Sequence, residues 1–141
     1  AVGWGGVSGL SGKNTEQINP GTVYTFAIGK NVAMPVYEKE AKKEYLTLPV
    51  EATDAQIAKG ASLFGKNCGP CHTLSANNTG GVIPNLTYSH PDIMGAFHQI
   101  VRDGIFLPKG MPKFKGRLSD EDISNIKGYI LSSAKKNRES K

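Results

Sequence analysis

The fold class that this 141-residue sequence predicts is mainly α: about three helices and long loops, preceded by an irregular N-terminal segment with a short β-strand. Apolar residues recur at helical spacing in three windows after residue 50. Each window begins with a capping residue or a proline, and stretches rich in glycine and proline separate the windows. Residues 50–135 are therefore expected to form three helices joined by two long loops.

The first 50 residues have a different composition. Residues 1–21 hold six glycines and too few apolar side chains to build a core. The stretch from Thr22 to Ile28 is rich in β-branched and aromatic residues, which predicts a short strand. A charged linker follows, and we predict a domain boundary between residues 50 and 51, with residues 1–50 mobile or draped on the domain.

The first helix is predicted from Thr53, a good N-cap, to about Gly65, with Gln56 completing a capping box. The second is predicted from Pro91 to Gly104. The third begins after the cap Ser119. Apolar stripes mark the three helices in turn: Ile57, Ala61 and Phe64; Ile93, Phe97, Ile100 and Val101; Ile123, Ile126, Ile130 and Leu131.

Three helices with two long loops supply few large apolar side chains for a core. A large apolar group such as a porphyrin would make up the shortage. Residues 68–72, CGPCH, point to the same group, because covalent haem attachment needs two thiols for the vinyl groups and an adjacent imidazole for the iron. Cys68, Cys71 and His72 meet these needs.

Two other interpretations of the CGPCH motif stay open. A dithiol redox site usually follows a strand in a βαβ unit, whereas this motif follows a predicted helix. A structural zinc site needs four ligands, so a distant histidine would have to join the single cysteine pair.

Met111 is the predicted sixth iron ligand, because methionine sulfur opposite a histidine suits electron transfer. It lies between Gly110, which lets the backbone approach the ring, and Pro112, which fixes the chain direction. The alternative side chains are Met34, Met94, His90 and His98.

Two supporting residues are predicted around the haem. The carbonyl of Pro84 is expected to accept the His72 ring N–H, which orients the ring and increases its basicity. Arg102 is expected to pair with a haem propionate. The alternatives are a plain loop proline and a solvated arginine.

The net charge is +5, and the basic residues are dispersed except in the C-terminal tail, which predicts a solvated basic surface and no nucleic-acid site. The sequence contains no run of about 18 apolar residues, so no membrane span is expected. The first ten residues do not resemble a signal peptide, so we expect a processed chain or a piece of a longer one.

These motifs resemble those of the class I bacterial cytochromes c over residues 53–134. The resemblance implies that fold around one covalent haem c, with histidine and methionine as iron ligands and a glycine–aromatic contact between the first and last helices. The corresponding residues are His72, Met111, Pro84, Gly60, Phe64 and Tyr129.

A second resemblance covers the N-terminal part. The glycine-rich stretch with Trp4, the sequence TVYTFAIGKNVAMP and the charged linker are similar to the end of a pyrroloquinoline quinone (PQQ) β-propeller. This junction precedes the haem domain in quinohaemoprotein alcohol dehydrogenases. The resemblance implies a propeller-end extension and linker at 1–50 and a cytochrome c domain at 51–141. The segment GMPKFKGRLSDEDISNIKGYILS is also similar to that domain.

The resemblance implies a periplasmic domain that carries single electrons and performs no catalysis itself. Its donor would be a PQQ-containing dehydrogenase domain or subunit, and its acceptor a downstream cytochrome, cupredoxin or oxidase. The alternatives are an independent small periplasmic cytochrome, a haem enzyme or sensor with an open iron position, and a haem-free dithiol oxidoreductase.

Overall fold

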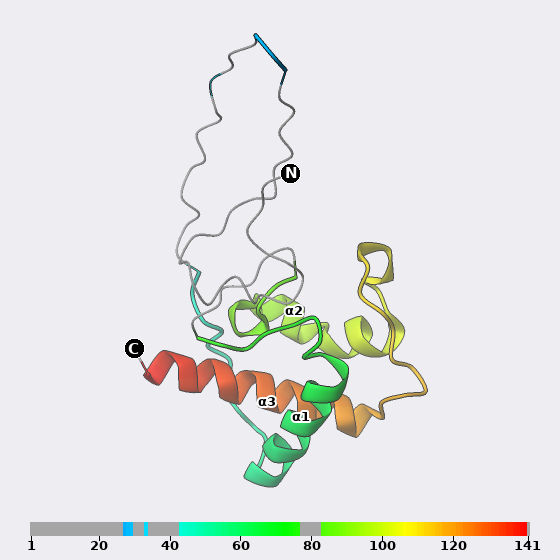
Figure 1. The fold of residues 1–141 in the computed structure, drawn as a ribbon. Helices are drawn as coiled ribbons and strands as arrows, with labels where there is room; N and C mark the ends of the chain where they lie inside the picture. Colours follow the sequence, from blue (N-terminus) through cyan, green and yellow to red (C-terminus); the bar gives the residue numbers. More distant parts are fainter. Residues whose placement is uncertain (1–26, 30–32, 34–42, 77–82, 141) are drawn as a thin grey trace.

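A computed structural model of the chain describes residues 27–29, 33, 43–76 and 83–140. The strand predicted at 22–28 falls almost entirely outside these residues. The described part is mainly helical, as predicted, and Figure 1 shows its arrangement. The elements in chain order are α1 (Asp54–Asn67), η2 (Leu86–Tyr88), α2 (Pro91–Gly95), η3 (Gln99–Asp103), η4 (Leu107–Lys109) and α3 (Asp120–Glu139).

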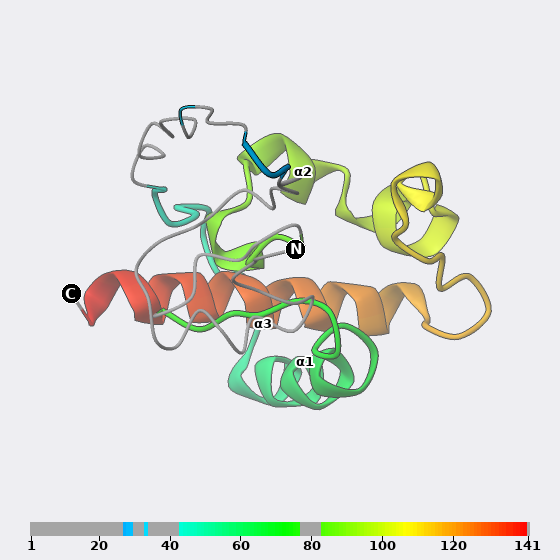
Figure 2. The ribbon, with the colours of Figure 1, turned by 45° about the horizontal axis from the view of Figure 1, so that its top comes forward.

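The helices α1 and α3 cross and form the base of the domain (Figures 1 and 2). Both begin at the expected caps, Thr53 and Ser119; the capping box predicted at Thr53 is confirmed, and Ser119 forms one as well. A Cβ at Gly60 would lie 2.0 Å from the backbone oxygen of Asn125, so only glycine allows this approach. The Phe64 and Tyr129 rings meet edge to face, with centroids 5.6 Å apart. The predicted glycine–aromatic crossing is confirmed.

The second predicted helix is interrupted. α2 ends at Gly95, the chain turns at Ala96, and η3 continues as a short π-helix to Gly104, where φ is +77°. The interruption changes which side is buried: Ile93, predicted to face the core, is 37% exposed, while Met94 is 1% exposed. The prediction for Ile93 was wrong because one helical period does not run through the break.

The core lies between α3 and the elements on either side of it. The apolar stripe of α3 is buried as predicted, with Ile123, Ile126 and Ile130 at 0% exposure. Phe64 of α1 and Phe97, Val101 and Phe114 of the opposite side belong to the same cluster. This core fixes α3 as the central support of the domain.

The segment before α1 also packs on the domain. Residues 45–52, here called the strap, are extended and pass α3 before entering α1 (cyan in Figures 1 and 2). Tyr45 and Leu46 are buried, and the Cβ of Ala52 would lie 2.6 Å from a Cβ at Gly128. The packed domain therefore begins several residues before α1.

Candidate haem site

A tight turn follows α1 and carries the CGPCH motif. The backbone N–H groups of Cys71 and His72 both donate to the carbonyl of Cys68, at 3.0 and 2.7 Å. The N–H of Cys68 in turn donates to Phe64 at the end of α1. The helix end thus places both thiols and the imidazole on one turn, and neither thiol is in a disulfide.

The ring of His72 is oriented by the Pro84 carbonyl, 2.9 Å from Nδ1. A carbonyl oxygen can only accept, so Nδ1 carries the proton and the lone pair lies on Nε2. This is the arrangement in which a histidine binds a metal through Nε2 while a hydrogen bond fixes its orientation. The predicted hydrogen bond between Pro84 and His72 is confirmed.

A buried polar cluster, missed in the sequence, holds His72 and Pro84 in register. Asn85 and Thr87 are 1% and 0% exposed. The Asn85 side chain accepts from the Thr87 N–H and hydroxyl, at 2.9 and 2.8 Å, and donates to the carbonyl of Ser75 at 2.9 Å. The only sequence signal was the position of Asn85, directly after the proline that was predicted to bond His72.

Further bonds join the same two segments to each other and to α3. The N–H of Leu86 donates to Thr73 at 3.2 Å. The Asn137 side chain of α3 donates to the carbonyl of Leu74 at 2.8 Å. Residues 72–76 are therefore held on one side by residues 84–86 and on the other by the last turns of α3.

Met111 lies in a loop that is anchored at both ends. The Phe114 N–H donates to Val101 at 2.8 Å, and the Met111 N–H donates to Phe106 at 3.2 Å. Gly110 has φ +89°, a conformation that favours glycine. The Met111 side chain is partly buried against the core cluster. The loop thus holds the thioether in a defined environment.

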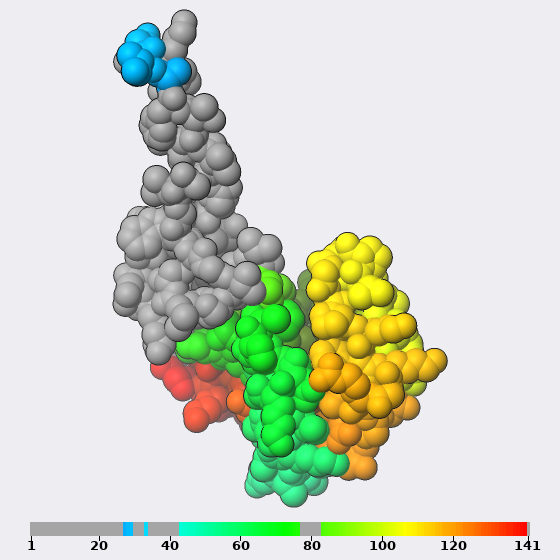
Figure 3. All heavy atoms as spheres, turned by 45° about the vertical axis from the view of Figure 1, so that its right-hand side comes forward, coloured from blue at the N-terminus to red at the C-terminus, as the bar shows by residue number. Residues whose placement is uncertain are grey.

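The surface is notched between the segments that carry the motif and Met111. Figure 3 shows the notch between the green segment after α1 and the yellow lobe. On the lobe, Ile105 and Leu107 are 52% and 53% exposed. A hollow of about 430 Å³ also borders His72 and is lined by Phe64 and Tyr129.

These donors and surfaces fit haem c. The site offers two unpaired thiols for thioether bonds, an imidazole with Nε2 available, and a methionine sulfur, which together are the ligands of an electron-transfer haem. The exposed apolar side chains of the lobe are the kind of surface that a porphyrin buries.

The dithiol alternative conflicts with the state of Cys68. Burial, and secondarily the neighbouring Cys71, raise the pKa of the Cys68 thiol to about 11. Reactive dithiols need a lowered thiol pKa, because the thiolate is the nucleophile. Cys68 has the opposite property, so the motif is poorly suited to dithiol exchange.

The histidines considered as alternative ligands have local roles. The His90 ring caps α2 by accepting from the Asp92 N–H. The Nε2 of His98 lies 3.3 Å from the Ser124 hydroxyl. Among the residues that the structure describes, no group of three or more His, Cys, Asp or Glu side chains is placed to hold a metal ion.

Arg102 lies between two carboxylates. Its guanidinium contacts Asp103 at 3.0 Å and Asp120 at 3.1 Å. The hydrogen bond from Arg102 lowers the pKa of Asp103. Arg102 therefore ties the end of η3 to the start of α3, and its pairing with a propionate stays a prediction.

Comparison with known proteins gives one family match. Residues 55–130 match the family model described as cytochrome c oxidase, cbb3-type, subunit III. This range begins with α1 and includes the motif, the Met111 loop and most of α3. No helix in the described ranges is long and apolar enough to cross a membrane.

Individual relatives are of two kinds. The 1-butanol dehydrogenase (cytochrome c) of Thauera butanivorans is 41% identical over 95% of this chain and 19% of its own length. The crystal structure of the quinohemoprotein alcohol dehydrogenase from Comamonas testosteroni covers 96% of this chain and 19% of its own, at 36% identity and a TM-score of 0.72. Cytochrome c6 of Thermostichus vulcanus is 32% identical over 65% of this chain and 83% of its own length.

Proposed function

This chain belongs to the cytochrome c family, and we propose that it is the electron-transfer domain of a PQQ-dependent dehydrogenase. It would take single electrons from the reduced quinone of another domain or subunit and pass them to a respiratory acceptor. As in its relatives, the chain carries one covalent haem c, which supplies one-electron iron chemistry when bound.

The observation that carries this proposal is the His72–Pro84 hydrogen bond on the CGPCH turn. In this assignment Cys68 and Cys71 hold the porphyrin, and Nε2 of His72 and the sulfur of Met111 bind the iron. With both residues bound to the iron, the haem would supply electron transfer and would offer no site for a substrate. The protein then contributes orientation and a low-dielectric surrounding, and no bond of a substrate is broken here.

The dehydrogenase context is supported by the extent of the matches. The chain spans about a fifth of the length of the dehydrogenases, while their matches cover 95% of this chain. We assign residues 1–50 to the end of a propeller and residues 51–141 to the cytochrome domain. PQQ binding and alcohol oxidation would then belong to other parts of the protein, and the compartment would be the periplasm.

An acceptor site is proposed on the Met111 loop. Residues 104–118 contain four cations and no acidic residue, and the four are exposed: Lys109, Lys113, Lys115 and Arg117. Such a surface steers an acidic partner and speeds a transient encounter. The proposed acceptor is a cytochrome, cupredoxin or oxidase with an acidic docking face. Lys113→Glu should slow its reduction, most strongly at low salt.

A stopped-flow experiment tests the donor. The oxidised, haem-loaded chain is mixed with the propeller part of a PQQ-dependent alcohol dehydrogenase reduced by its alcohol, and haem reduction is followed. We expect rapid reduction by one electron per chain. Slow reduction by this donor, with normal reduction by dithionite, would instead support an independent carrier, as the cytochrome c6 match allows.

A further inference from the structure

The N-terminal end of the strap is bonded to both segments that hold His72. The Leu46 N–H donates to the carbonyl of Thr87 at 2.8 Å. The Tyr45 hydroxyl donates to the carbonyl of Ala76 at 3.3 Å, and its ring stacks on Tyr88 with centroids 4.5 Å apart. Tyr45 is 7% and Leu46 3% exposed, so both side chains are buried in this contact.

These contacts continue directly to the iron-binding side. Thr87 is bonded to the Asn85 side chain, and Asn85 follows Pro84, whose carbonyl accepts from His72. At the other end of the same cluster, Ala76 closes the segment that begins at His72. Thr87 and Asn85 therefore connect the strap to the Pro84 carbonyl that accepts from His72.

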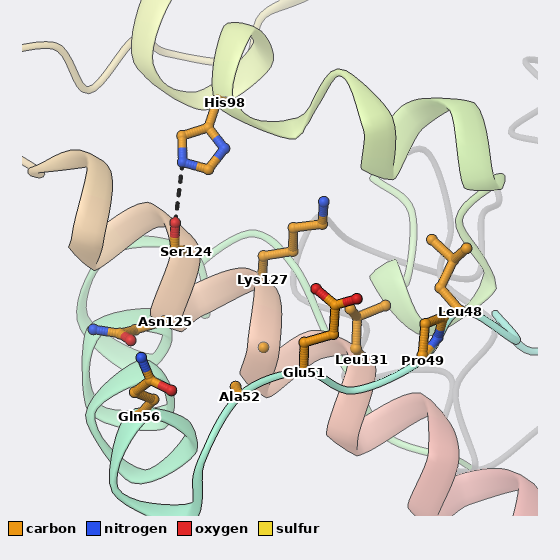
Figure 4. Close-up of a pocket in the computed structure, with 11 residues that line it drawn as sticks. Leu48, Pro49, Glu51, Ala52, Gln56, His98, Ser124, Asn125, Lys127 and Leu131 are labelled. Atoms are coloured by element: carbon orange, nitrogen blue, oxygen red, sulfur yellow. Dashed lines mark hydrogen bonds between the residues drawn. The ribbon is translucent and has the colours of Figure 1, made fainter.

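The strap has two separate attachments to α3. Near its start, the guanidinium of Arg138 donates to the carbonyl of Leu46. At its end, Ala52 packs against Gly128. Between them lies a hollow of about 410 Å³, into which the side chains of Glu51 and Lys127 project (Figure 4). The two ends can thus be altered independently.

We propose that the strap is a positioning element of the haem site. Through Tyr45 and Leu46 it holds the segment from His72 to Ala76 against the segment from Pro84 to Thr87, and so it fixes the hydrogen bond that orients His72. The inference rests on the proposed assignment of His72 as an iron ligand.

The consequence is an effect on the reduction potential. The bond from Nδ1–H to the Pro84 carbonyl increases the basicity of the imidazole, which favours ferric over ferrous iron. When the strap is loosened, this bond is made less often and the ferric state loses stabilisation. The midpoint potential should therefore rise.

In a dehydrogenase, the same strap residues would couple the preceding propeller domain to the iron ligand His72. The strap includes the last residues of the N-terminal extension, so a displacement of that extension would reach His72 through Tyr45 and Leu46. The strap would then adjust the iron ligand in addition to joining the domains.

The test uses the haem-loaded chain of 141 residues and two measurements: the midpoint potential by spectroelectrochemistry and amide exchange by mass spectrometry. Two variants, Tyr45→Ala and Leu46→Ala, loosen the N-terminal end of the strap. Tyr45→Phe keeps the stacking on Tyr88 and removes the hydroxyl, with its bond to Ala76 and its hydrogen bond with Tyr88. Gly128→Ala is the matched control, because its new Cβ disturbs the strap at Ala52, away from the haem segments.

We expect Tyr45→Ala and Leu46→Ala to accelerate exchange in residues 72–76 at least tenfold and to raise the midpoint potential, with Tyr45→Phe intermediate. Gly128→Ala should lower overall stability and leave both readouts unchanged. Unchanged exchange and potential in Tyr45→Ala, with a normal haem spectrum, would overturn the inference and leave the electron-transfer function intact. A wild-type chain without a haem spectrum after maturation would overturn both.

Discussion

The helix crossing and the loop layer of this domain differ in how fully their apolar side chains are buried. The crossing, formed by α1 and α3, buries the apolar stripe of α3 and Phe64 of α1, and two capping boxes satisfy the helix N-termini. The loop layer, residues 68–76 and 83–118, leaves Ile105 and Leu107 half exposed and two thiols unpaired. From this difference we expect the crossing to be stabilised mainly by the polypeptide and the loop layer to depend also on the haem.

Removing the thioether bonds should produce the largest difference in amide-exchange protection between the two regions. In Cys68→Ala/Cys71→Ala the covalent haem is lost, and we expect amide exchange in residues 104–118 to approach that of an unfolded chain. Residues 123–131 of α3 should keep more protection than the loops, because α1 still packs on one side of α3. Exchange mass spectrometry measures both.

The single variant Cys71→Ala, which keeps one thioether, is the control for that experiment. Its loop layer should exchange at a rate between those of the wild type and the double variant. Equal loss of protection in α3 and in residues 104–118 would contradict the independence of the crossing.

Phe64→Ala tests the crossing directly. It removes a ring that is 7% exposed and packs on Tyr129, so the free energy of unfolding should fall by about 3–5 kcal/mol. Denaturant unfolding measures the loss. Phe64→Leu keeps most of the buried volume and should lose markedly less, and equal losses in the two variants would show that packing is not the cause.

Gly60→Ala tests the close approach of the helices. Its Cβ would meet the Asn125 backbone at 2.0 Å, which must push α1 and α3 apart and should cost about 1–3 kcal/mol. Gly65→Ala is the matched control on the same helix, with no atom near its new Cβ; it should stabilise by about 0.5–1 kcal/mol. Thermal unfolding of both variants distinguishes the effect of the helix–helix contact from that of helix propensity. An equal change of stability in both variants would contradict the account.

Acid should weaken both regions slightly. Bonds from Ser119 and then Lys59 lower the pKa of Asp122 in the crossing, and Arg102 lowers the pKa of Asp103 in the loop layer. A lowered folded-state pKa gives stability that is present above the unfolded value, about 3.9, and is lost as pH falls through the folded value.

Melting temperatures between pH 6 and pH 2 should therefore fall less steeply in Asp122→Asn and in Asp103→Asn than in the wild type. Asp103 is exposed and Asp122 is partly exposed, so added salt should reduce the difference. An identical pH dependence in all three proteins would show that these carboxylates do not contribute.

The two regions also differ in how far the sequence predicted them. Thr53 and Ser119 marked the helix starts because capping is local, and Ile126 and Ile130 followed from a regular period. The break at Ala96 escaped prediction, because the change to a π-helix alters the period without any proline.

At the haem site, Cys68, Cys71 and His72 were identified as a contiguous motif, and the Pro84–His72 bond was predicted from the loop proline and again from the family resemblance. The burial of Tyr45 and its bond to Ala76 were missed, because these contacts join residues 31 apart in a stretch of mixed polar character. Only the fold brings such partners together.

The central claim is a haem held by His72 and Met111 with no open iron position. The most direct test is the visible spectrum of the haem-loaded chain and of Met111→Ala, oxidised and reduced, with and without carbon monoxide. The account predicts the weak far-red band of methionine-ligated ferric haem and no response to carbon monoxide in the wild type, with the band lost and carbon monoxide bound in the variant. A wild-type spectrum without that band, shifted by carbon monoxide, would contradict the account and indicate an open-site haem protein.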